Sequence, residues 1–152
     1  VRNPTNFGTT TVATAATRRQ IYAAVFSSVS GTFAADEEIN QASTGAVGKV
    51  VEYDATNKLL YWVQTRFPDV GTDTNGNATA FSGANAITGQ TSSAAATPLT
   101  SSSTDVNGVS ITSGYSNPEL AADSGDIIYV EERSPITRAS DQTENIKLII
   151  EF

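Results

Sequence analysis

The chain contains no cysteine, no histidine and no methionine among its 152 residues. Without cysteine it forms no disulfide bond and offers no thiol nucleophile, and without histidine the Ser-His-Asp and Cys-His catalytic arrangements are excluded. Zinc sites made of thiolates or imidazoles are excluded for the same reason. Any catalysis would have to rest on carboxylates, so we expect a protein that is not an enzyme and that needs no cofactor.

Charged residues are also scarce, at 16%, and acidic ones outnumber basic ones, which gives a net charge of −7. An acidic surface is not attracted to phosphate backbones, and the single basic doublet, Arg18-Arg19, is too small to form a nucleic-acid patch. No apolar run approaches the roughly 20 residues that a membrane-spanning helix needs. We therefore expect no nucleic-acid partner and no membrane insertion. The start at Val1, with no methionine anywhere, is typical of a fragment or a processed product.

Small polar residues take the place of the missing charged and large apolar ones. Such a composition favours loop-rich β proteins over helical bundles, which need Leu, Glu and Lys. We predict a mainly β fold, a small β-sandwich or barrel-like module with long loops and little helix. The expected organisation is an extended arm or linker over residues 1–19, a β module over 20–100, and C-terminal strands over 101–152 that complete or join it.

The clearest local pattern is "GKVVEYDATNKLLYWVQTRF", which predicts a β-hairpin over residues 49–65. Two runs rich in β-branched and aromatic residues flank "DATNK", which places Asp, Thr and Asn at turn positions. By alternation we expect Val51, Tyr53, Leu60 and Trp62 to supply cross-strand pairs and a core face.

Other segments are assigned more coarsely. "QIYAAVF" is apolar on both faces and reads as a buried strand, and "DIIYVEE" and "ENIKLIIEF" are the strongest strand patterns of the chain. Residues 91–108 have low sequence complexity, so we expect an excursion or linker that fills no core, with a boundary near Ser101. Asn117-Pro118 is compatible with one helical turn over 118–122.

A short internal echo stands on either side of the hairpin. Phe33 is followed six residues later by Ile39, and Phe81 is followed six residues later by Ile87. Both stretches continue into Gln, Thr, Ser and Ala. Two similar loop-strand units around one hairpin predict a small closed β module from about Gly31 to Ala96.

Three patterns have a chemical interpretation, and each has a plainer one that we favour. Asp36 and Glu38 share a face if the segment is extended, an arrangement that would suit a glycosidase pair, but they are more typical of a solvated strand end. Asp73, Asn75 and Asn77 begin like a calcium loop, but Ala78 and Ala84 stand where Gly and Glu are needed. Tyr61 and Trp62 would suit stacking on a sugar, although such alternation more often places one ring in the core.

The last stretch, "SGDIIYVEERSPITRASDQTENIKLIIEF", resembles the C-terminal end of the gene-eight baseplate wedge protein of T-even-like contractile-tailed phages. The resemblance rests on Ser124-Gly125, Ile128-Tyr129, Pro135-Ile136, the run "DQTE" from Asp141 and the terminal Phe152. It implies a mainly β structural subunit that dimerises, holds other baseplate wedge proteins together, and has no enzymatic activity. The middle of the chain resembles instead a small β module of phage virion proteins, particularly those of marine cyanophages.

The polar residues between the two last predicted strands are therefore candidate assembly contacts. These are Arg133, Arg138, Asp141, Gln142 and Glu144, where arginine would make bidentate contacts to a partner's carboxylates. A solvated connection with weak ion pairs is the alternative for this corner. The resulting hypothesis is a virion protein of the tail baseplate. A carbohydrate-binding or host-attachment module, motivated by Tyr61 and Trp62, is the alternative function.

Overall fold

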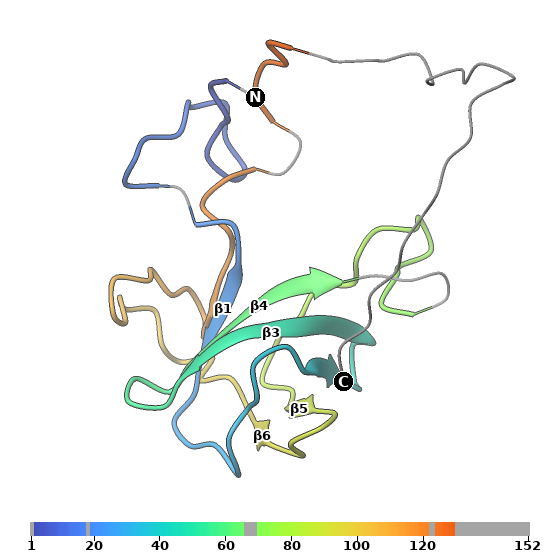
Figure 1. Cartoon of the computed structure of the whole chain (residues 1–152). Helices are drawn as coiled ribbons and strands as arrows, with labels where there is room; N and C mark the ends of the chain where they lie inside the picture. Colours follow the sequence, from blue (N-terminus) through green and yellow to red (C-terminus); the bar gives the residue numbers. More distant parts are fainter. Residues whose placement is uncertain (1, 18, 66–69, 122–123, 130–152) are drawn as a thin grey trace, which may run out of the picture.

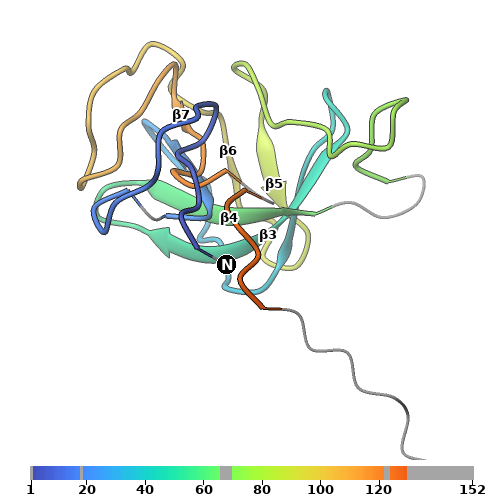
Figure 2. The same ribbon diagram turned by 90° about the horizontal axis from the view of Figure 1, so that it is seen from above.

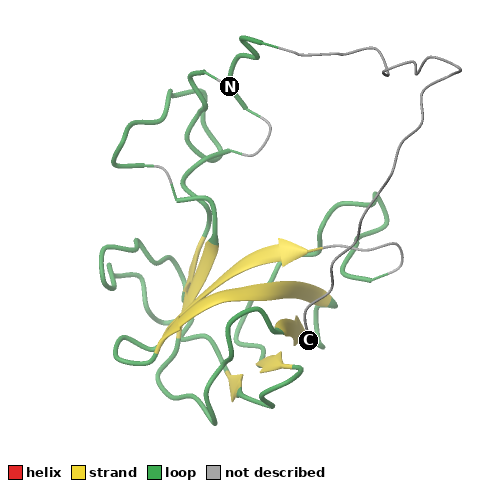
Figure 3. Cartoon of the chain, viewed as in Figure 1, coloured by secondary structure: helices red, strands yellow, loops and turns green. Residues whose placement is uncertain are grey.

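The computed structural model describes residues 2–17, 19–65, 70–121 and 124–129. Seven strands form one antiparallel sheet in the order β6-β5-β2-β3-β4-β1-β7. Loops make up more of this part of the chain than strands do (Figures 1 and 3), and it contains no helix. The mainly β prediction is thus confirmed, and residues 118–121 do not form the helical turn considered for them.

The long hairpin at the centre of the sheet is the one that the sequence predicts. Strand β3 (Ala46–Asp54) pairs with β4 (Leu59–Thr65) along almost its whole length. The connecting turn is held by Asp54, whose Oδ1 accepts hydrogen bonds from the backbone N–H groups of Thr56 and Asn57 at 2.9 and 3.0 Å. An Asp side chain that binds the backbone two and three residues ahead is what closes such a turn.

A β-bulge in β3 changes which of its side chains face the core. Val50 pairs with Trp62, whereas Glu52 pairs with Tyr61, so Val51 has no partner of its own in the ladder. An extra residue in one strand shifts the alternation of the side chains that follow it. Val50 is therefore buried, at 1% exposure, and Val51 is 44% exposed. The prediction that Val51 faces the core was wrong because simple alternation does not contain the bulge.

Shorter strands extend the sheet on both sides of the hairpin. β1 (Tyr22–Val25) lies against β4, and β7 (Tyr115–Ser116) lies against β1. On the other side β2 (Glu38–Gln41) pairs with β3, and β5 (Ile87–Gly89) and β6 (Ala95–Ala96) follow.

The two ends of the sheet approach each other without forming a closed barrel. Isolated bridges join Phe26 to Pro98 and Ser30 to Ala95, and the second pair exchanges two backbone hydrogen bonds of 2.9 Å each. No continuous ladder follows from them in the described residues, so the sheet is strongly curled and the module remains open.

The main core lies on one face of this curled sheet. Trp62 is at its centre, with its ring stacked on Tyr22 at 5.8 Å between centroids and edge-on to Phe81 at 5.1 Å. The four echo residues identified in the sequence all belong to the core: Phe33, Ile39, Phe81 and Ile87. Their shared environment arises because β2 and β5 are neighbouring strands.

The low-complexity segment contributes to this core, which corrects the expectation of an excursion. Ala94 is completely buried and Ala96 nearly so, and both pack in the cluster around Trp62. Composition misleads here because alanine adds little apolar area, yet it is the residue that fits where larger core side chains already fill the space.

The opposite face of the sheet carries a second, smaller core. Residues from β1 and β4 lie under the loop that follows β6, and the buried members are Ala23, Val25, Leu59, Val109 and Ile111. The two cores together explain why β1 is apolar on both faces, as its sequence predicts.

The beginning of the chain runs beside the segment that leads to the C-terminal region. Arg2 and Asp126 exchange backbone hydrogen bonds of 2.9 and 2.7 Å, and Asn6 forms an isolated bridge with Leu120. Figures 1 and 2 both show the two segments side by side, and Figure 1 shows them away from the strands. The division of the chain into an arm, a module and C-terminal strands stays a prediction.

The strand expected to begin at Asp126 is not present in its described part. Ile127, Ile128 and Tyr129 follow the Arg2 bridge but belong to no strand. A strand needs a neighbour for its backbone groups, and these residues have none in the described chain. The rest of this pattern, and the whole of "ENIKLIIEF", lies outside the described residues.

The bulge predicts opposite outcomes for two adjacent valines. Val50→Ala removes buried methyl groups beside Trp62 and should lower the free energy of unfolding by about 1–3 kcal/mol. Val51→Ala removes exposed ones and should change it by less than about 0.5 kcal/mol. Urea denaturation followed by Trp62 fluorescence measures both. Equal losses for the two variants would contradict the bulged register.

Candidate functional site

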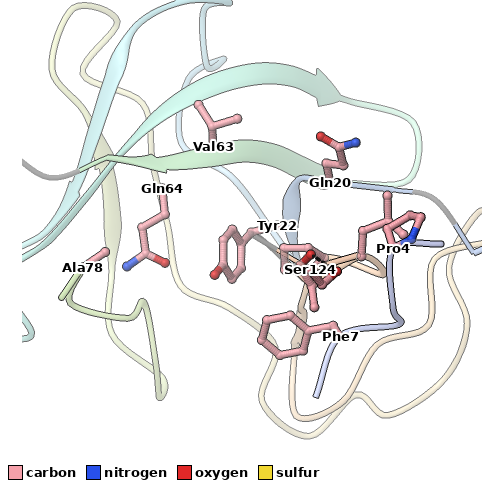
Figure 4. Close-up of a pocket in the computed structure, with 11 residues that line it drawn as sticks. Pro4, Phe7, Gln20, Tyr22, Val63, Gln64, Ala78 and Ser124 are labelled. Atoms are coloured by element: carbon pink, nitrogen blue, oxygen red, sulfur yellow. Dashed lines mark hydrogen bonds between the residues drawn. The ribbon is translucent and has the colours of Figure 1, made fainter. Parts of the chain in front are cut away.

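A cavity of about 550 Å³ opens between the sheet and the paired N-terminal and C-terminal segments. Strand β1 contributes Tyr22 at its first residue, and β4 contributes Val63 and Gln64 near its end (Figure 4). Ala78, from the loop after β4, also lines the cavity. The two flanking segments provide most of the remaining wall, with Pro4, Phe7, Pro118, Leu120, Ala121 and Ser124 among its residues. None of the lining side chains is charged.

The polar groups of this cavity are largely engaged within the chain. The Nε2 of Gln64 donates a hydrogen bond to the carbonyl oxygen of Thr79, and the Ser124 hydroxyl donates to Ala121. The Tyr22 ring is stacked on Trp62, and burial raises the pKa of its hydroxyl. The cavity is thus a mainly apolar recess, and it has no group activated for acid–base chemistry.

An exposed apolar run lies just beyond the cavity wall. Ile127, Ile128 and Tyr129 are 74%, 67% and 73% exposed, more than any other large hydrophobic residue of the described chain. Contiguous exposed apolar side chains are typical of a surface that another chain covers.

The structure does not place the candidate assembly contacts. Arg133, Arg138, Asp141, Gln142 and Glu144 all lie outside the described residues. They follow directly on Ile127–Tyr129 in the sequence, so the exposed run is the described part of the chain that leads to them.

Arg19, from the only basic doublet, has a structural role. Its Nη2 donates hydrogen bonds to Ser116 Oγ at 2.6 Å and to the Asn117 carbonyl oxygen at 2.7 Å. The Glu119 carboxylate accepts from the Arg19 backbone N–H at 2.8 Å. Desolvation lowers the pKa of the guanidinium, although Glu119 acts in the opposite direction. Arg19 therefore fastens the N-terminal segment to the residues after β7.

The acidic pair considered for catalysis, Asp36 and Glu38, lies at an exposed position on the surface. Asp36 and Glu38 line a shallow recess of about 250 Å³ with Gly48, Lys49 and Thr65. The Asp36 carboxylate is 3.8 Å from the Lys49 ammonium group, and both side chains are largely exposed. No aromatic residue lines this recess, so it lacks the platform that a sugar cleft usually has.

Glu37, which the sequence did not single out, is the buried carboxylate of the region. It is only 5% exposed. Its Oε1 accepts from the Ala34 N–H at 2.7 Å and the Ser92 hydroxyl at 2.8 Å, and its Oε2 accepts from the N–H groups of Ser92 at 2.9 Å and Thr91 at 3.1 Å. The three bonds from Thr91 and Ser92 join the approach to β2 to the turn between β5 and β6, and the bond from Ala34 lies within that approach.

The electrostatics of Glu37 follow from this geometry. Desolvation raises the pKa of the carboxyl group, but the hydrogen bonds from Ser92, Ala34 and Thr91 outweigh it and lower the pKa below its ordinary value. Gly89 leaves the room for the carboxylate, because a Cβ at this position would lie 2.6 Å from either oxygen. A sequence signal for this arrangement is hard to find, since Thr91 and Ser92 lie more than 50 residues away and two of their three bonds come from backbone N–H groups.

The aromatic pair proposed for sugar stacking does not form an open platform. Trp62 is 1% exposed and forms part of the main core, and Tyr61 is half-buried against the smaller one. Neither indole face is therefore available to a ligand.

The loop that begins like a calcium site is a turn closed by its own first residue. Asp73 Oδ1 accepts from the backbone N–H groups of Asn75 and Asn77, both at 2.8 Å. Among the described residues no three Asp or Glu side chains come together in a group that could hold a metal ion. The same part of the chain has no helix long and apolar enough to cross a bilayer.

Comparison with known proteins identifies one family. Residues 78–152 match the Phage-Gp8 family, described as Bacteriophage T4, Gp8. No curated protein and no solved structure matches the chain. The matched region begins at the cavity residue Ala78 and includes the exposed run and all five candidate contacts.

Replacing Glu37 tests whether its carboxylate holds the two loops together. Glu37→Gln puts an NH₂ donor where backbone donors converge, and it should lower the free energy of unfolding by about 1–3 kcal/mol near neutral pH. Glu38→Gln is the matched control, because Glu38 is exposed and should change stability by less than about 0.5 kcal/mol.

The same pair gives a pH dependence with a defined sign. Because the folded-state pKa of Glu37 is depressed, its contribution is complete above the pKa of an unfolded glutamate, about 4.3, and is lost as the pH falls through the folded-state value. The difference between wild type and Glu37→Gln should therefore shrink in acid. Thermal unfolding measured from neutral to acidic pH checks this, and a difference that stays constant would exclude the ionised carboxylate as its cause.

Proposed function

We propose that the chain acts through protein–protein contacts made by its C-terminal part, because residues 78–152 match the Phage-Gp8 family of baseplate wedge proteins. The protein is a structural component of the virion and is located in the tail baseplate. The observation that carries the proposal is the family match, which covers the region containing the exposed run and the candidate contacts.

The described structure supports a division of roles along the chain. The curled sheet buries its large side chains in two cores, whereas Ile127, Ile128 and Tyr129 project from a segment that has left the sheet. In the proposal these three side chains provide apolar contact area. Arg133, Arg138, Asp141, Gln142 and Glu144 then add polar contacts that fix the partner's orientation, which is how charged groups usually contribute to interfaces.

The proposed partners are other baseplate wedge proteins and a second copy of the chain. With a net charge of −7, the chain attracts basic partner surfaces in preference to acidic ones. The proposal assigns no catalytic step and no cofactor. The carbohydrate-binding alternative has no support in the described structure, because Trp62 is in the core.

Removing the exposed apolar run tests the proposal. The triple variant Ile127→Ser, Ile128→Ser, Tyr129→Ser should keep the unfolding temperature of the wild type, since none of the three side chains is buried. Loss of these three apolar side chains should weaken binding to the neighbouring wedge proteins by tenfold or more. A tenfold weaker binding corresponds to about 1.4 kcal/mol of lost binding free energy. Co-purification of the full-length subunit with the other wedge proteins, followed by titration, measures this.

Two controls sharpen the result. Val51→Ser with Val70→Ser removes exposed apolar side chains elsewhere and should leave binding unchanged. The double variant Arg133→Ala, Arg138→Ala addresses the polar contacts separately. Sedimentation of each variant reports self-association. Wild-type binding by both the triple variant and the arginine variant would refute the proposed contact region.

A further inference from the structure

Two Asn-Gly pairs occur in the chain, and they lie in different environments. Asn75-Gly76 belongs to the turn around Asp73, and Asn107-Gly108 forms the tip of the small hairpin between Val106 and Val109. Both pairs are exposed to solvent. An asparagine followed by glycine can react with its own backbone, because glycine has no side chain that hinders the approach of its nitrogen. The structure offers a comparison of this reactivity within one molecule.

At Asn75 the attacking nitrogen is engaged. The Gly76 N–H donates a hydrogen bond to the Asp73 carbonyl oxygen at 3.0 Å. The Asp73 carboxylate also collects the N–H groups of Asn75 and Asn77, and these hydrogen bonds lower its pKa, so it is ionised at neutral pH. A negative charge at the centre of the turn opposes the loss of a further amide proton.

At Asn107 the attacking nitrogen has no such engagement. Val106 and Val109 exchange two backbone hydrogen bonds of 2.9 Å, and Asn107 and Gly108 between them have φ values of 49° and 76°. This is a two-residue hairpin turn, in which the central N–H groups point to solvent. The Gly108 N–H donates no hydrogen bond to another described residue. Only the side chain of Asn107 is held, through Nδ2 to Asp54 Oδ2 at 3.4 Å.

We propose that Asn107 is a deamidation site of the folded protein and that it reacts in preference to Asn75. The Gly108 nitrogen bonds to Asn107 Cγ and gives up its proton, while the Cγ–Nδ2 bond breaks and the side-chain nitrogen leaves as ammonia. Water then opens the resulting succinimide ring, which yields aspartate or isoaspartate at position 107. The step consumes one water molecule, and it involves no oxidant or reductant.

The modification would act on the smaller core. It replaces the donor that faces Asp54 with a carboxylate, so an attractive contact between the two turns becomes a repulsion between like charges. Val109 is buried in that core and Val106 packs against it. Loosening the hairpin tip therefore weakens the loop that covers Leu59 and Val25.

Peptide mapping by mass spectrometry on the full chain tests the proposed order. The chain is incubated at mildly alkaline pH and sampled over time, and a second incubation in urea gives the rates of the two pairs in the unfolded state. After division by these unfolded-state rates, Asn107 should deamidate severalfold faster than Asn75. An equal or faster normalised rate at Asn75 would overturn the proposal.

Two substitutions test the structural consequence. Asn107→Asp imitates the product and should lower the midpoint of thermal unfolding. Asn75→Asp, which adds the same charge to an exposed turn, should leave the midpoint near that of the wild type. In a background carrying Asp54→Asn, the further change Asn107→Asp should lower the midpoint by less than it does in the wild type, because the repulsion between the two carboxylates is absent. Identical midpoints for wild type and Asn107→Asp would show that the site is not coupled to the core.

Discussion

The packing of Trp62 between Tyr22 and Phe81 is the interaction on which the other parts of the sheet depend. Trp62 lies on β4, the strand that pairs with both β3 and β1, so its ring is fixed by the longest ladder of the chain. Its ring contacts Tyr22 at the beginning of β1 and Phe81 in the segment before β5, so both segments pack against the same side chain. Gly48 is required opposite it, since a Cβ there would lie 2.8 Å from the indole ring. One large side chain thereby organises strands that are individually too short to be stable.

Buried polar groups compensate for the shortage of large apolar residues. Glu37 joins two loops through three of its four hydrogen bonds, and Gln41, which is completely buried, uses both ends of its amide. The Gln41 Nε2 donates to the Asn85 carbonyl and the Tyr115 hydroxyl, and its Oε1 accepts from Thr44 and Ser82. A buried polar group is tolerated when its partners are all present, and it then specifies one arrangement of the loops. Because loops make up most of the described chain, apolar burial alone would not fix their arrangement, and the buried hydrogen bonds do so.

The sequence predicted those features that depend on local pattern. The hairpin over 49–65 follows from β-branched runs around an Asp-initiated turn. The echo of Phe and Ile marks two strands, β2 and β5, which the structure makes neighbours, but the closed module predicted from it is open. Val51 was misplaced because a bulge is a property of strand pairing and not of one strand. Ala94 and Ala96 were missed because their burial depends on the space left by distant aromatic rings. Glu37 was missed for a similar reason, since three of its four hydrogen bonds come from Thr91 and Ser92 in a remote loop, two of them from backbone groups that carry no side-chain signature.

The shape of the sheet also limits how the chain can associate. Its outer strands, β6 and β7, are only two residues long, so they offer little unpaired backbone to a strand from another protein. An extensive contact would therefore have to use side chains on segments that leave the sheet. Ile127, Ile128 and Tyr129 meet that condition, because they combine high exposure with a position beyond the last contact to the N-terminal segment. The geometry of the sheet and the match of residues 78–152 to the Phage-Gp8 family thus favour the same part of the chain as the proposed assembly surface.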